Sequence, residues 1–520
     1  MENYLITNTL GYPILSLLLI VPAIGALGCL FIKDETWLKA WSLVVSVATL
    51  VLSLPLFTSF DATTAKYQFA EVGRWFPALN LDYVVGVDGI SAPLVLLTTF
   101  IIPLCVLCSW RHIRERVKEF MIVMLLMETA MIGVFVSLNT ILFYFFWEGM
   151  LIPMYLIIAV WGGPRKDYAS IKFFLYTFAG SIFLFVAIIA LYISTGTFFI
   201  PGLMEHHFPF MYQMWIFLAF ALSFAVKVPV YPLHTWLPAA HVEAPAAGSV
   251  ILASILLKMG GYGFLRFCLP VAPQATIACI PWMIGIGLVS IIFGSYLALG
   301  QSDMKKLIAY SSVGHMGFVT LGIFLLNDLG IKGAILQMIN HGITTGALFI
   351  CVGLVYERTH SREISANSAL GKAMPAFLTF FTIFSLASFG FPGTNGFVSE
   401  LLVLIAAFTR YPWVGFVSVV GAVLAAAYML RLLQKMIWDK SGCPGHGGHG
   451  HDHEESAHAP ADLDMREWAT LAFLTFFVLW IGFQPRPLLN MMDKSVNHLL
   501  SQVNAGKTTV AQTGKFALKR

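Results

Sequence analysis

Fourteen long runs of apolar residues, separated by short polar or Pro/Gly-rich segments, constrain this 520-residue chain more than any other feature. Hydrophobic residues make up 58% of the sequence and charged residues 11%, whereas a soluble domain is about 45–50% apolar and about 25% charged. About 20 apolar residues are enough for a helix to cross a bilayer. The sequence therefore predicts an all-α polytopic membrane protein with fourteen transmembrane helices. It excludes the soluble globular, disordered, collagen-like and disulfide-rich classes.

The distribution of Lys and Arg predicts how these spans are oriented. The spans are expected near 12–32, 37–57, 89–109, 120–138, 139–161, 171–194, 211–240, 246–268, 275–300, 307–326, 330–356, 374–409, 413–437 and 466–484. Short loops rich in Lys and Arg face the cytoplasm, and here they follow odd-numbered spans. They contain Arg111, Arg114, Arg116 and Lys118, then Arg165 and Lys166, then Lys305 and Lys306, then Arg358, Arg362 and Lys372. The loop at 195–210 contains neither residue type, so both termini are predicted to lie outside.

Two of the spans are interrupted by helix breakers. Pro229 and Pro232 lie in span 7, and Pro392 is followed by Gly393 in span 12. Proline removes a backbone donor and clashes with the preceding turn, and paired breaks in two halves are typical of transporters with internal repeats. Because the two spans are five apart, we expect two inverted five-helix repeats, helices 4–8 and 9–13. The chain then divides into helices 1–3 (1–110), the first repeat (111–270), the second repeat (271–438), a His-rich cytoplasmic loop (439–465), and helix 14 with a C-terminal tail (466–520).

Six ionisable residues lie at membrane depth in this arrangement. A charged side chain at a helix centre costs about 2.5–3.5 kcal/mol or more unless it is paired or hydrated, so such residues indicate function. A row of titratable groups bridged by water would carry protons along the membrane as well as across it. We therefore predict a proton pathway with an uptake half-channel in the first repeat and an exit in the second. Its residues are Glu148, Lys227, Lys258, His315, His341 and Glu400.

Glu148 and Lys227 are the candidate pair of the first repeat. Lys227 precedes the break in span 7, where the prolines are expected to leave the carbonyl groups of Ala225 and Val228 without their usual helical donors. An ammonium group at that point has acceptors nearby. A carboxylate and an ammonium that pair and then separate would capture and release a proton; a static structural ion pair is the alternative.

The other four residues continue the row through the second half of the chain. Lys258 lies midway along span 8, too deep to reach either surface easily. His315 in span 10 and His341 in span 11 carry imidazoles, which titrate near neutral pH and pass protons through both nitrogens. Glu400 follows the break in span 12. Two buried lysines beside two histidines favour a relay over four separate packing residues.

Three further titratable residues lie in or near the spans. Glu128 belongs to span 4, at a depth that depends on where that span begins. His234 and His241 follow Lys227 at intervals of seven residues, which places them near one face if the helix resumes after the break.

Five segments resemble the antiporter-like membrane subunits of respiratory complex I. They are FFWEGMLIPMYLII, LSFAVKVPVYPLHTWLPAAHVEAP, SDMKKLIAYSSVGHMGF, INHGITTGALF and FPGTNGFVSE. The resemblance covers nearly the whole chain and implies fourteen helices, two inverted five-helix repeats and a proton channel driven by quinone reduction elsewhere in the complex. It also implies a subunit of the translocase NADH:quinone oxidoreductase in a bacterial cytoplasmic membrane. Its partners would be the other membrane subunits, above all the neighbouring antiporter-like ones, and the lipid bilayer.

The resemblance implies roles for individual residues. Glu148 matches the glutamate that modulates the adjacent lysine, and Lys227 matches the pumping lysine. Lys258 matches the bridging lysine of helix 8. His315 and His341 match polar positions of the central axis.

The last residue of the row points to one branch of the family. Glu400 matches the terminal ionisable group, which is glutamate in M-type subunits and usually lysine in L-type subunits. The chain also ends soon after span 14, so we expect none of the long lateral helix of the L type. Both features favour the M type.

The segment 440–460 departs from the family pattern. Several histidines with acidic neighbours could bind a divalent metal, but glycine-rich spacing fixes no geometry, so we interpret the segment as a flexible hydrophilic loop and predict no metal site. The histidines are His446, His449, His451, His453 and His458.

Two other functions remain open from the sequence. The D-type subunit of a multisubunit sodium/proton antiporter shares nearly all these motifs, including the terminal glutamate. A divalent-metal transporter is suggested by the histidine loop. Against it, the intramembrane histidines lack acidic ligands one turn on, since His315 is followed by Val319 and His341 by Thr345.

The chain is not expected to carry a redox cofactor. It contains no dinucleotide fingerprint, haem attachment motif or four-cysteine cluster spacing. FMN, iron–sulfur clusters and quinone are therefore expected in partner subunits. The formal charge of +4, with its basic residues scattered over short loops, does not indicate nucleic-acid binding.

Overall fold

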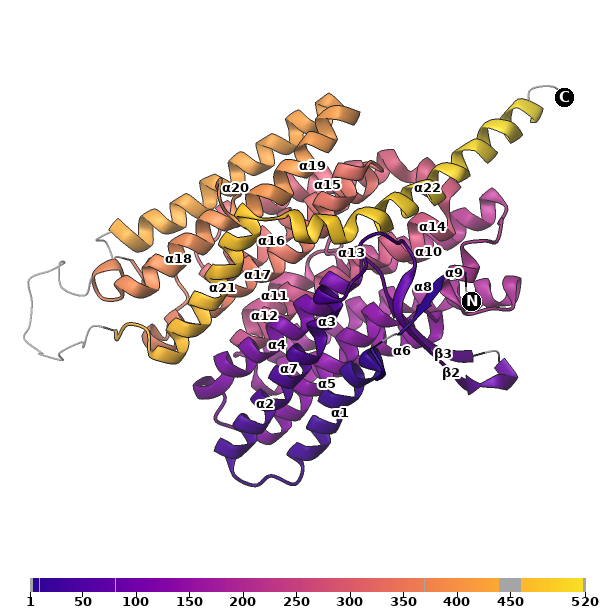
Figure 1. Ribbon diagram of the computed structural model, residues 1–520. Coiled ribbons are helices and arrows are strands. Elements are labelled where there is room, and N and C mark those ends of the chain that lie inside the picture. The colour runs from indigo at the N-terminus through magenta and orange to yellow at the C-terminus, as the bar shows by residue number, and fades with distance from the viewer. Residues whose placement is uncertain (1–2, 9, 80, 369, 439–459, 518–520) are drawn as a thin grey trace, which may run out of the picture.

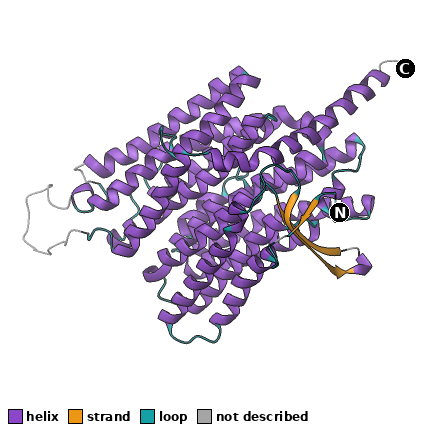
Figure 2. Cartoon of the chain, viewed as in Figure 1, coloured by secondary structure: helices purple, strands orange, loops and turns teal. Residues whose placement is uncertain are grey.

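The computed structural model describes the chain apart from residues 1–2, 9, 80, 369, 439–459 and 518–520. Figure 1 and Figure 2 show a bundle built almost entirely of helices, with one small group of strands near the N-terminus. The helices of the first part are α1 (Ile14–Cys29), α2 (Glu35–Ser53), α3 (Pro55–Thr58), α4 (Ala92–His112), α5 (Val117–Val136), α6 (Thr140–Gly149), α7 (Leu151–Trp161), α8 (Lys166–Thr195), α9 (Ile200–Leu203), α10 (Phe210–Lys227) and α11 (Trp236–Glu243). Those that follow are α12 (Ala246–Ile251), α13 (Leu257–Gly263), α14 (Leu269–Val271), α15 (Pro273–Leu299), α16 (Met304–Phe324), α17 (Asp328–Thr359), α18 (Pro375–Ser388), α19 (Asn395–Arg410), α20 (Pro412–Trp438), α21 (Met465–Phe483) and α22 (Arg486–Ala517).

The predicted spans are present as helices. Twelve helical segments in the described part of the chain are long and apolar enough to cross a membrane, and α1 and α18 are shorter apolar helices. Together they account for the fourteen predicted spans. The all-α polytopic fold is therefore confirmed.

Ion pairs join loops that the charge distribution places on the same side. Arg111, after span 3, lies 2.7 Å from Asp464, just before α21. Arg362, after span 11, lies 3.6 Å from Asp303, just before α16. These contacts put the loops after spans 3, 9, 11 and 13 at one end of the bundle, which we call the basic end. Figure 1 places both chain termini at the opposite end, together with the strands, which we call the sheet end.

The helices differ in how much of their surface the bundle covers. The apolar window of span 8 (246–271) is 100% buried and those of α16 and α17 are 94% buried, whereas α2 and α21 are 33% buried. Span 8, α16 and α17 thus form the interior, and the outer helices present apolar faces to lipid. A titratable side chain on an interior helix is enclosed by protein rather than by lipid, which is where such residues occur in membrane proteins.

Both predicted helix breaks are present. In span 7, α10 ends at Lys227 and α11 resumes at Trp236, and in span 12, α18 ends at Ser388 and α19 begins at Asn395. The second break needs glycine, because Gly390 has φ +75° and Gly393 has φ +91°, values that side-chain-bearing residues rarely adopt. The breaks divide each span into two short helices whose ends lie inside the bundle.

As expected, the Ala225 carbonyl group lacks its usual helical donor, because position 229 is a proline. The backbone N–H of Val230, one residue further on, donates to it instead at 3.1 Å. The chain turns sharply enough after α10 to close this wider backbone loop. The Val226 carbonyl group accepts from the indole N–H of Trp236 at 2.9 Å, which fastens α11 to α10.

Span 8 contains two irregularities that the sequence pattern does not indicate. Residues Leu252–Leu256 and Phe264–Cys268 form π-helical turns on either side of α13. A π-helical turn shifts the side chains that follow it around the helix and is frequent at functional sites. Here the two turns flank the short helix that carries Lys258.

The strands were not predicted. β1 (Leu5–Thr7) pairs in parallel with β2 (Tyr67–Phe76), and β2 pairs antiparallel with β3 (Leu81–Val87). Figure 2 shows these strands in orange beside the N-terminus. A search for long apolar runs passes over them because they are short and are interrupted by polar residues. The region 1–110 therefore holds a small sheet as well as helices.

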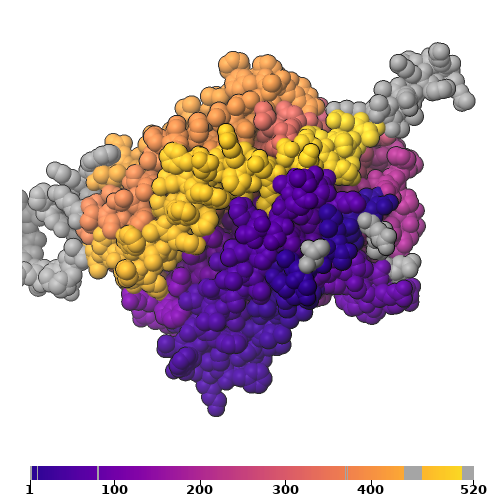
Figure 3. All heavy atoms as spheres, in the orientation of Figure 1, coloured from indigo at the N-terminus to yellow at the C-terminus, as the bar shows by residue number. Residues whose placement is uncertain are grey.

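The C-terminal segment forms a helix where the sequence analysis expects a tail. Helix α22 spans Arg486–Ala517 and packs on α14, α15 and α17. Its described side chains bury one face at spacings of three and four residues, through Leu488, Met492, Val496, Leu499 and Val503. Figure 3 shows this segment in yellow, lying across the surface of the bundle. The helix is amphipathic and too polar overall to be found as a span.

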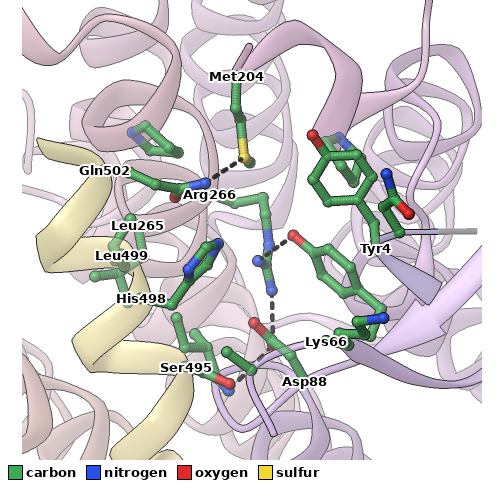
Figure 4. A pocket seen from close by; sticks show the side chains of 16 residues that line it. Tyr4, Lys66, Asp88, Met204, Leu265, Arg266, Ser495, His498, Leu499 and Gln502 are labelled. Atoms are coloured by element: carbon green, nitrogen blue, oxygen red, sulfur yellow. Dashed lines mark hydrogen bonds and ion pairs between the residues drawn. The ribbon is translucent and has the colours of Figure 1, made fainter. Parts of the chain in front are cut away.

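A buried ion pair joins three parts of the fold at the sheet end. Arg266, at the end of span 8, lies 2.7 Å from Asp88, which follows β3. The guanidinium also donates to the hydroxyl of Tyr67 at 2.7 Å and to that of Tyr262 at 3.2 Å. Tyr67, Asp88 and Arg266 line a cavity of about 280 Å³, whose wall also includes Ser495 of α22 (Figure 4).

We expect Asp88→Asn to destabilise the protein. Burial raises the pKa of the Asp88 carboxyl, but Arg266 and neighbouring N–H groups lower it by more, so the net pKa lies below the ordinary value. The carboxylate thus contributes stability at neutral pH, and this contribution is lost as the pH falls through the lowered pKa. Removing one partner of a buried pair costs about 3–5 kcal/mol. The apparent melting temperature of the purified protein should fall, and it should fall much less for Ser495→Ala, which removes one hydrogen bond to the backbone of Gly89. Equal melting temperatures for Asp88→Asn and the wild type would contradict the stabilising role.

Candidate functional site

Four of the six predicted residues lie in one row inside the bundle. Lys258 Nζ lies 2.6 Å from His341 Nδ1. The ring centroids of His341 and His315 are 5.6 Å apart, and His315 Nδ1 lies 3.1 Å from Glu400 Oε1. We call this row the polar chain. It follows the order Lys258, His341, His315, Glu400, so the two histidines are met in the reverse of their sequence order.

All four side chains are removed from solvent. Lys258 is 0% exposed, and the other three are 4–5% exposed. Isolated charges at such positions would be very unfavourable, so the contacts within the row are what make these residues tolerable there.

Irregular backbone places both ends of the polar chain. The ammonium group of Lys258 donates to the carbonyl oxygen of Ala253, within the π-helical turn that precedes α13. At the other end, Glu400 belongs to the first turns of α19, after the break. A Cβ atom on Gly390 would lie 2.9 Å from Glu400 Oε2, so the glycine that forms the break also makes room for the carboxyl group.

Neutral polar side chains surround the middle of the polar chain. Gln337 Nε2 donates to Glu400 Oε1 at 3.3 Å, and Ser388 Oγ lies 3.4 Å from His315 Nε2. Asn340 and Thr344, with Gln337 and Ser388, line a small cavity of about 10 Å³, which has room for roughly one water molecule. His341 and His315 both line it, so a water molecule there would bridge the longest step of the row.

The two remaining predicted residues form a separate group at the first break. Lys227 is 3% exposed, and its ammonium group lies 4.9 Å from the ring centre of Trp147 and 3.8 Å from Met150 Sδ. Glu148 is half-buried; its carboxyl group interacts with the Ser181 hydroxyl and, at longer range, with Lys227. In the described part of the chain the two form no ion pair within 4.0 Å, so the structure shows the pair separated.

Two buried titratable groups stand apart from both sets. Glu128 is 0% exposed, and neither of its carboxyl oxygens has a hydrogen-bond partner among the described residues. His241 is likewise 0% exposed, has no described partner for either ring nitrogen, and stacks on Phe349 with ring centroids 4.5 Å apart. The structure therefore places Glu128 well inside the bundle, which the sequence left open.

The described residues contain no group of three or more His, Cys, Asp or Glu side chains placed to hold a metal ion. The histidines predicted to form a flexible loop lie within 440–460, of which only residue 460 is among the described residues.

Two broken helices around a buried row of lysine, histidine and glutamate side chains define a class of membrane protein, the transporter-like proteins that move ions through internal polar sites. Residues 137–425 match the family described as NADH:quinone oxidoreductase/Mrp antiporter, TM. Residues 16–134 match the family described as NADH-ubiquinone oxidoreductase chain 4, amino terminus.

Curated relatives match along nearly their whole length. The chain is 45% identical over 493 residues to NADH-quinone oxidoreductase subunit M of Rhodobacter capsulatus, covering 92% of this chain and 93% of the relative. It is 43% identical over 491 residues to NADH-ubiquinone oxidoreductase chain 4 of Arabidopsis thaliana, covering 94% and 97%. The chain belongs to this subunit M/chain 4 family of NADH:quinone oxidoreductases.

Solved structures share the fold. A chain of respiratory complex I from Thermus thermophilus with bound NADH superposes with a TM-score of 0.83 at 29% identity, covering 94% of this chain and 99% of that one. A chain of the Mrp complex from Dietzia sp. DQ12-45-1b gives a TM-score of 0.78 at 19% identity, covering 96% and 55%. The second likeness is one of fold alone.

Proposed function

We propose that this chain is a proton-translocating membrane-arm subunit of an NADH:quinone oxidoreductase and that protons move through it along the polar chain. The observation that carries the proposal is the succession of titratable groups from Lys258 to Glu400, with a small cavity at the one step, between His341 and His315, that no direct hydrogen bond spans. Membership of the subunit M/chain 4 family identifies the enzyme to which this chain belongs. The chain is a subunit of the translocase, and the redox reaction takes place in its partners.

Each member of the polar chain has a defined part in the transfer. The ammonium group of Lys258 donates a proton to His341 Nδ1, its contact at 2.6 Å. His341 Nε2, which has no described partner, releases a proton through the small cavity to His315. The contact at 3.1 Å then passes it from His315 Nδ1 to the carboxylate of Glu400. Each step moves one proton to the nitrogen or oxygen atom of the next group and leaves the donor deprotonated, so that it can receive the following proton.

Glu148 and Lys227 control proton uptake in this account. The lysine is held between an aromatic ring and a thioether, contacts that are weaker than an ion pair and therefore easily exchanged. Movement of the ammonium group toward the carboxylate would change the charge next to the break. Glu148 and Lys227 are separated in the structure. A capture-and-release cycle requires a separated state and a paired state, and the structure has the geometry of the separated one.

The site contains the groups for proton transfer, while electron transfer belongs to other chains. The sequence contains no dinucleotide fingerprint, haem attachment motif or four-cysteine cluster spacing, and we place FMN, the iron–sulfur clusters and the quinone in partner subunits. Quinone reduction there supplies the energy. The apolar outer faces of the bundle suit the bilayer on some sides and neighbouring antiporter-like subunits on others.

The orientation in the membrane follows from the loops. We place the basic end in the cytoplasm by the positive-inside rule and therefore both termini outside, in a bacterial cytoplasmic membrane. The basic loops lie at one end of the bundle and the two termini at the other, which supports this orientation (Figure 1).

The sodium/proton antiporter alternative is disfavoured by the level of identity. The chain is 45% identical to a subunit M, and its residues 16–134 match the family described as NADH-ubiquinone oxidoreductase chain 4, amino terminus. Purifying the chain in mild detergent separates the two: copurifying NADH-oxidising subunits support the proposal, and copurifying small antiporter subunits would overturn it.

We expect Glu148→Gln to impair proton translocation and Glu148→Asp to impair it less. Glutamine keeps the size and the hydrogen bond to Ser181 but cannot carry the negative charge that acts on Lys227, whereas aspartate keeps the charge and is one methylene shorter. The measurement is the initial rate of proton uptake by vesicles containing the assembled complex. Wild-type rates for both variants would show that Glu148 serves packing only.

A further inference from the structure

A third lysine is buried at the basic end of the bundle. Lys305 is the second residue of α16, next to the loop that precedes this helix. Basic residues at such a position would ordinarily lie in water. It is instead 8% exposed, and its Nζ lies 2.5 Å from the carbonyl oxygen of Ala244. Ala244 follows the last residue of α11, so this lysine contacts the end of the half-helix that continues span 7 after its break.

Lys305 lies at a cavity that could bring water inward. The cavity has a volume of about 180 Å³ and opens between the ends of α4, α7, α11 and α17. Its lining includes the titratable side chains His112, Glu243, Lys305 and Arg362. A space of this size with several polar groups can hold water molecules.

Most charges near this cavity already have partners. Glu243 lies 3.7 Å from Arg165 and accepts a backbone N–H from the same residue at 3.0 Å. Arg362 lies 3.6 Å from Asp303 and donates to the Val242 carbonyl group.

His112 is also paired, since it lies 3.3 Å from Glu357. Lys305 is different, because in the described part of the chain no carboxylate lies within 4.0 Å of its ammonium group. A lysine without a counter-charge exchanges its proton more readily than one held in an ion pair.

The next titratable group inward is His241. It lies on α11, three residues before Ala244, and neither of its ring nitrogens has a described partner. The side chains of Lys305 and Lys258 both interact electrostatically with it. His241 therefore lies within electrostatic range of both the lysine at the cavity and the first member of the polar chain.

We propose that Lys305 is the first proton-binding side chain of the uptake route from the basic end and that it feeds the polar chain through His241. The neutral amine of Lys305 takes a proton from hydronium in the cavity, leaving water. The resulting ammonium gives that proton to an unprotonated nitrogen of His241. His241 then gives a proton to the neutral amine of Lys258, and each donor returns to its starting state.

This inference rests on the proposed function, because it supplies the uptake step of the same proton pathway. The competing explanation is structural: a cation at Ala244 stabilises the C-terminal end of α11. Arginine separates the two, since it keeps the cation and can donate to the same carbonyl oxygen but does not give up its proton. The groups that face Lys305 and would shape its titration are Cys108 from α4, Glu243 from α11, and Asp303 and Arg362 beside it.

The test uses the whole complex reconstituted in vesicles, with proton translocation driven by NADH oxidation. We expect Lys305→Arg to assemble and to lower the translocation rate on the order of 100-fold, the typical contribution of a positioned proton-transfer group. Lys305→His should translocate, with its pH profile moved to lower pH, because histidine ordinarily titrates about four units below lysine. The matched control is Lys306→Arg, at a neighbouring lysine that does not line the cavity, and it should behave as the wild type.

Two results would overturn the inference. One is a wild-type translocation rate for Lys305→Arg, which would leave Lys305 with the structural role. The other is an unshifted pH profile for Lys305→His. This second result decides the question even if the arginine variant fails to assemble. Lys258→Met, measured alongside, tests the polar chain itself: a wild-type rate there would reject the proposed function, whereas a low rate there beside a normal Lys305→Arg rejects only the uptake step.

Discussion

Replacing Lys258 with methionine is expected to lower proton translocation by the complex on the order of 100-fold. Lys258 is 0% exposed, lies on the helix between two π-helical turns, and contacts His341 at 2.6 Å. Methionine fills nearly the same volume without an ammonium group, so packing is retained and the proton donor is lost. His341 then has no group from which to receive a proton, and the rest of the polar chain is cut off from the uptake side.

The measurement is the initial rate of NADH-driven acidification or alkalinisation in sealed vesicles, normalised to the amount of assembled complex. Met259→Leu is the matched control, since Met259 is the next residue and is also 0% exposed, and this exchange nearly conserves volume. The control should translocate as the wild type. A Lys258→Met complex that translocates at the wild-type rate would remove Lys258 from the pathway.

The second large effect is expected from Lys227→Ala, which should abolish or severely lower proton translocation. Lys227 ends α10 at the break of span 7 and carries the ammonium group that faces Trp147 and Met150. Alanine removes the charge on which Glu148 acts, so the capture-and-release step loses one of its two partners.

Because alanine also leaves a cavity, Lys227→Met serves as the second variant. It fills the space beside Trp147, and its loss of activity should match that of the alanine variant if the charge is what matters. Assembly of both complexes is checked by the amount of NADH-oxidising subunit that copurifies. Full translocation by the assembled methionine variant would show that Lys227 does not take part.

The parts of the fold that the sequence predicts are those set by the bilayer. Long apolar runs must form helices, because the backbone has no other way to satisfy its hydrogen bonds in lipid, and prolines and glycines fix where spans 7 and 12 break. The sheet and α22 cannot be predicted from apolar runs and helix breakers. Strands β1 and β2 pair residues far apart in the sequence, such as Leu5 and Tyr67, which are 62 residues apart. Helix α22 is stabilised by packing on other helices rather than by its own hydrophobicity.

The site shows the same division. Burial of a few charges in an apolar chain identifies the six residues, but the contacts depend on how the helices pack. The π-helical turn before α13 turns Lys258 toward His341, and nothing in the one-dimensional pattern indicates that turn. The same holds for Lys305, which the sequence marks only as a positive charge in a loop, although the structure buries it against α11.

The number of protons translocated per NADH oxidised, compared between the wild-type complex and the Lys258→Met complex, tests the central claim most directly. It separates proton movement from electron transfer, which a rate alone does not. If the polar chain carries protons, the ratio falls in the variant while NADH oxidation by the peripheral subunits can still be measured with an artificial electron acceptor. An unchanged ratio in a fully assembled Lys258→Met complex would contradict the account.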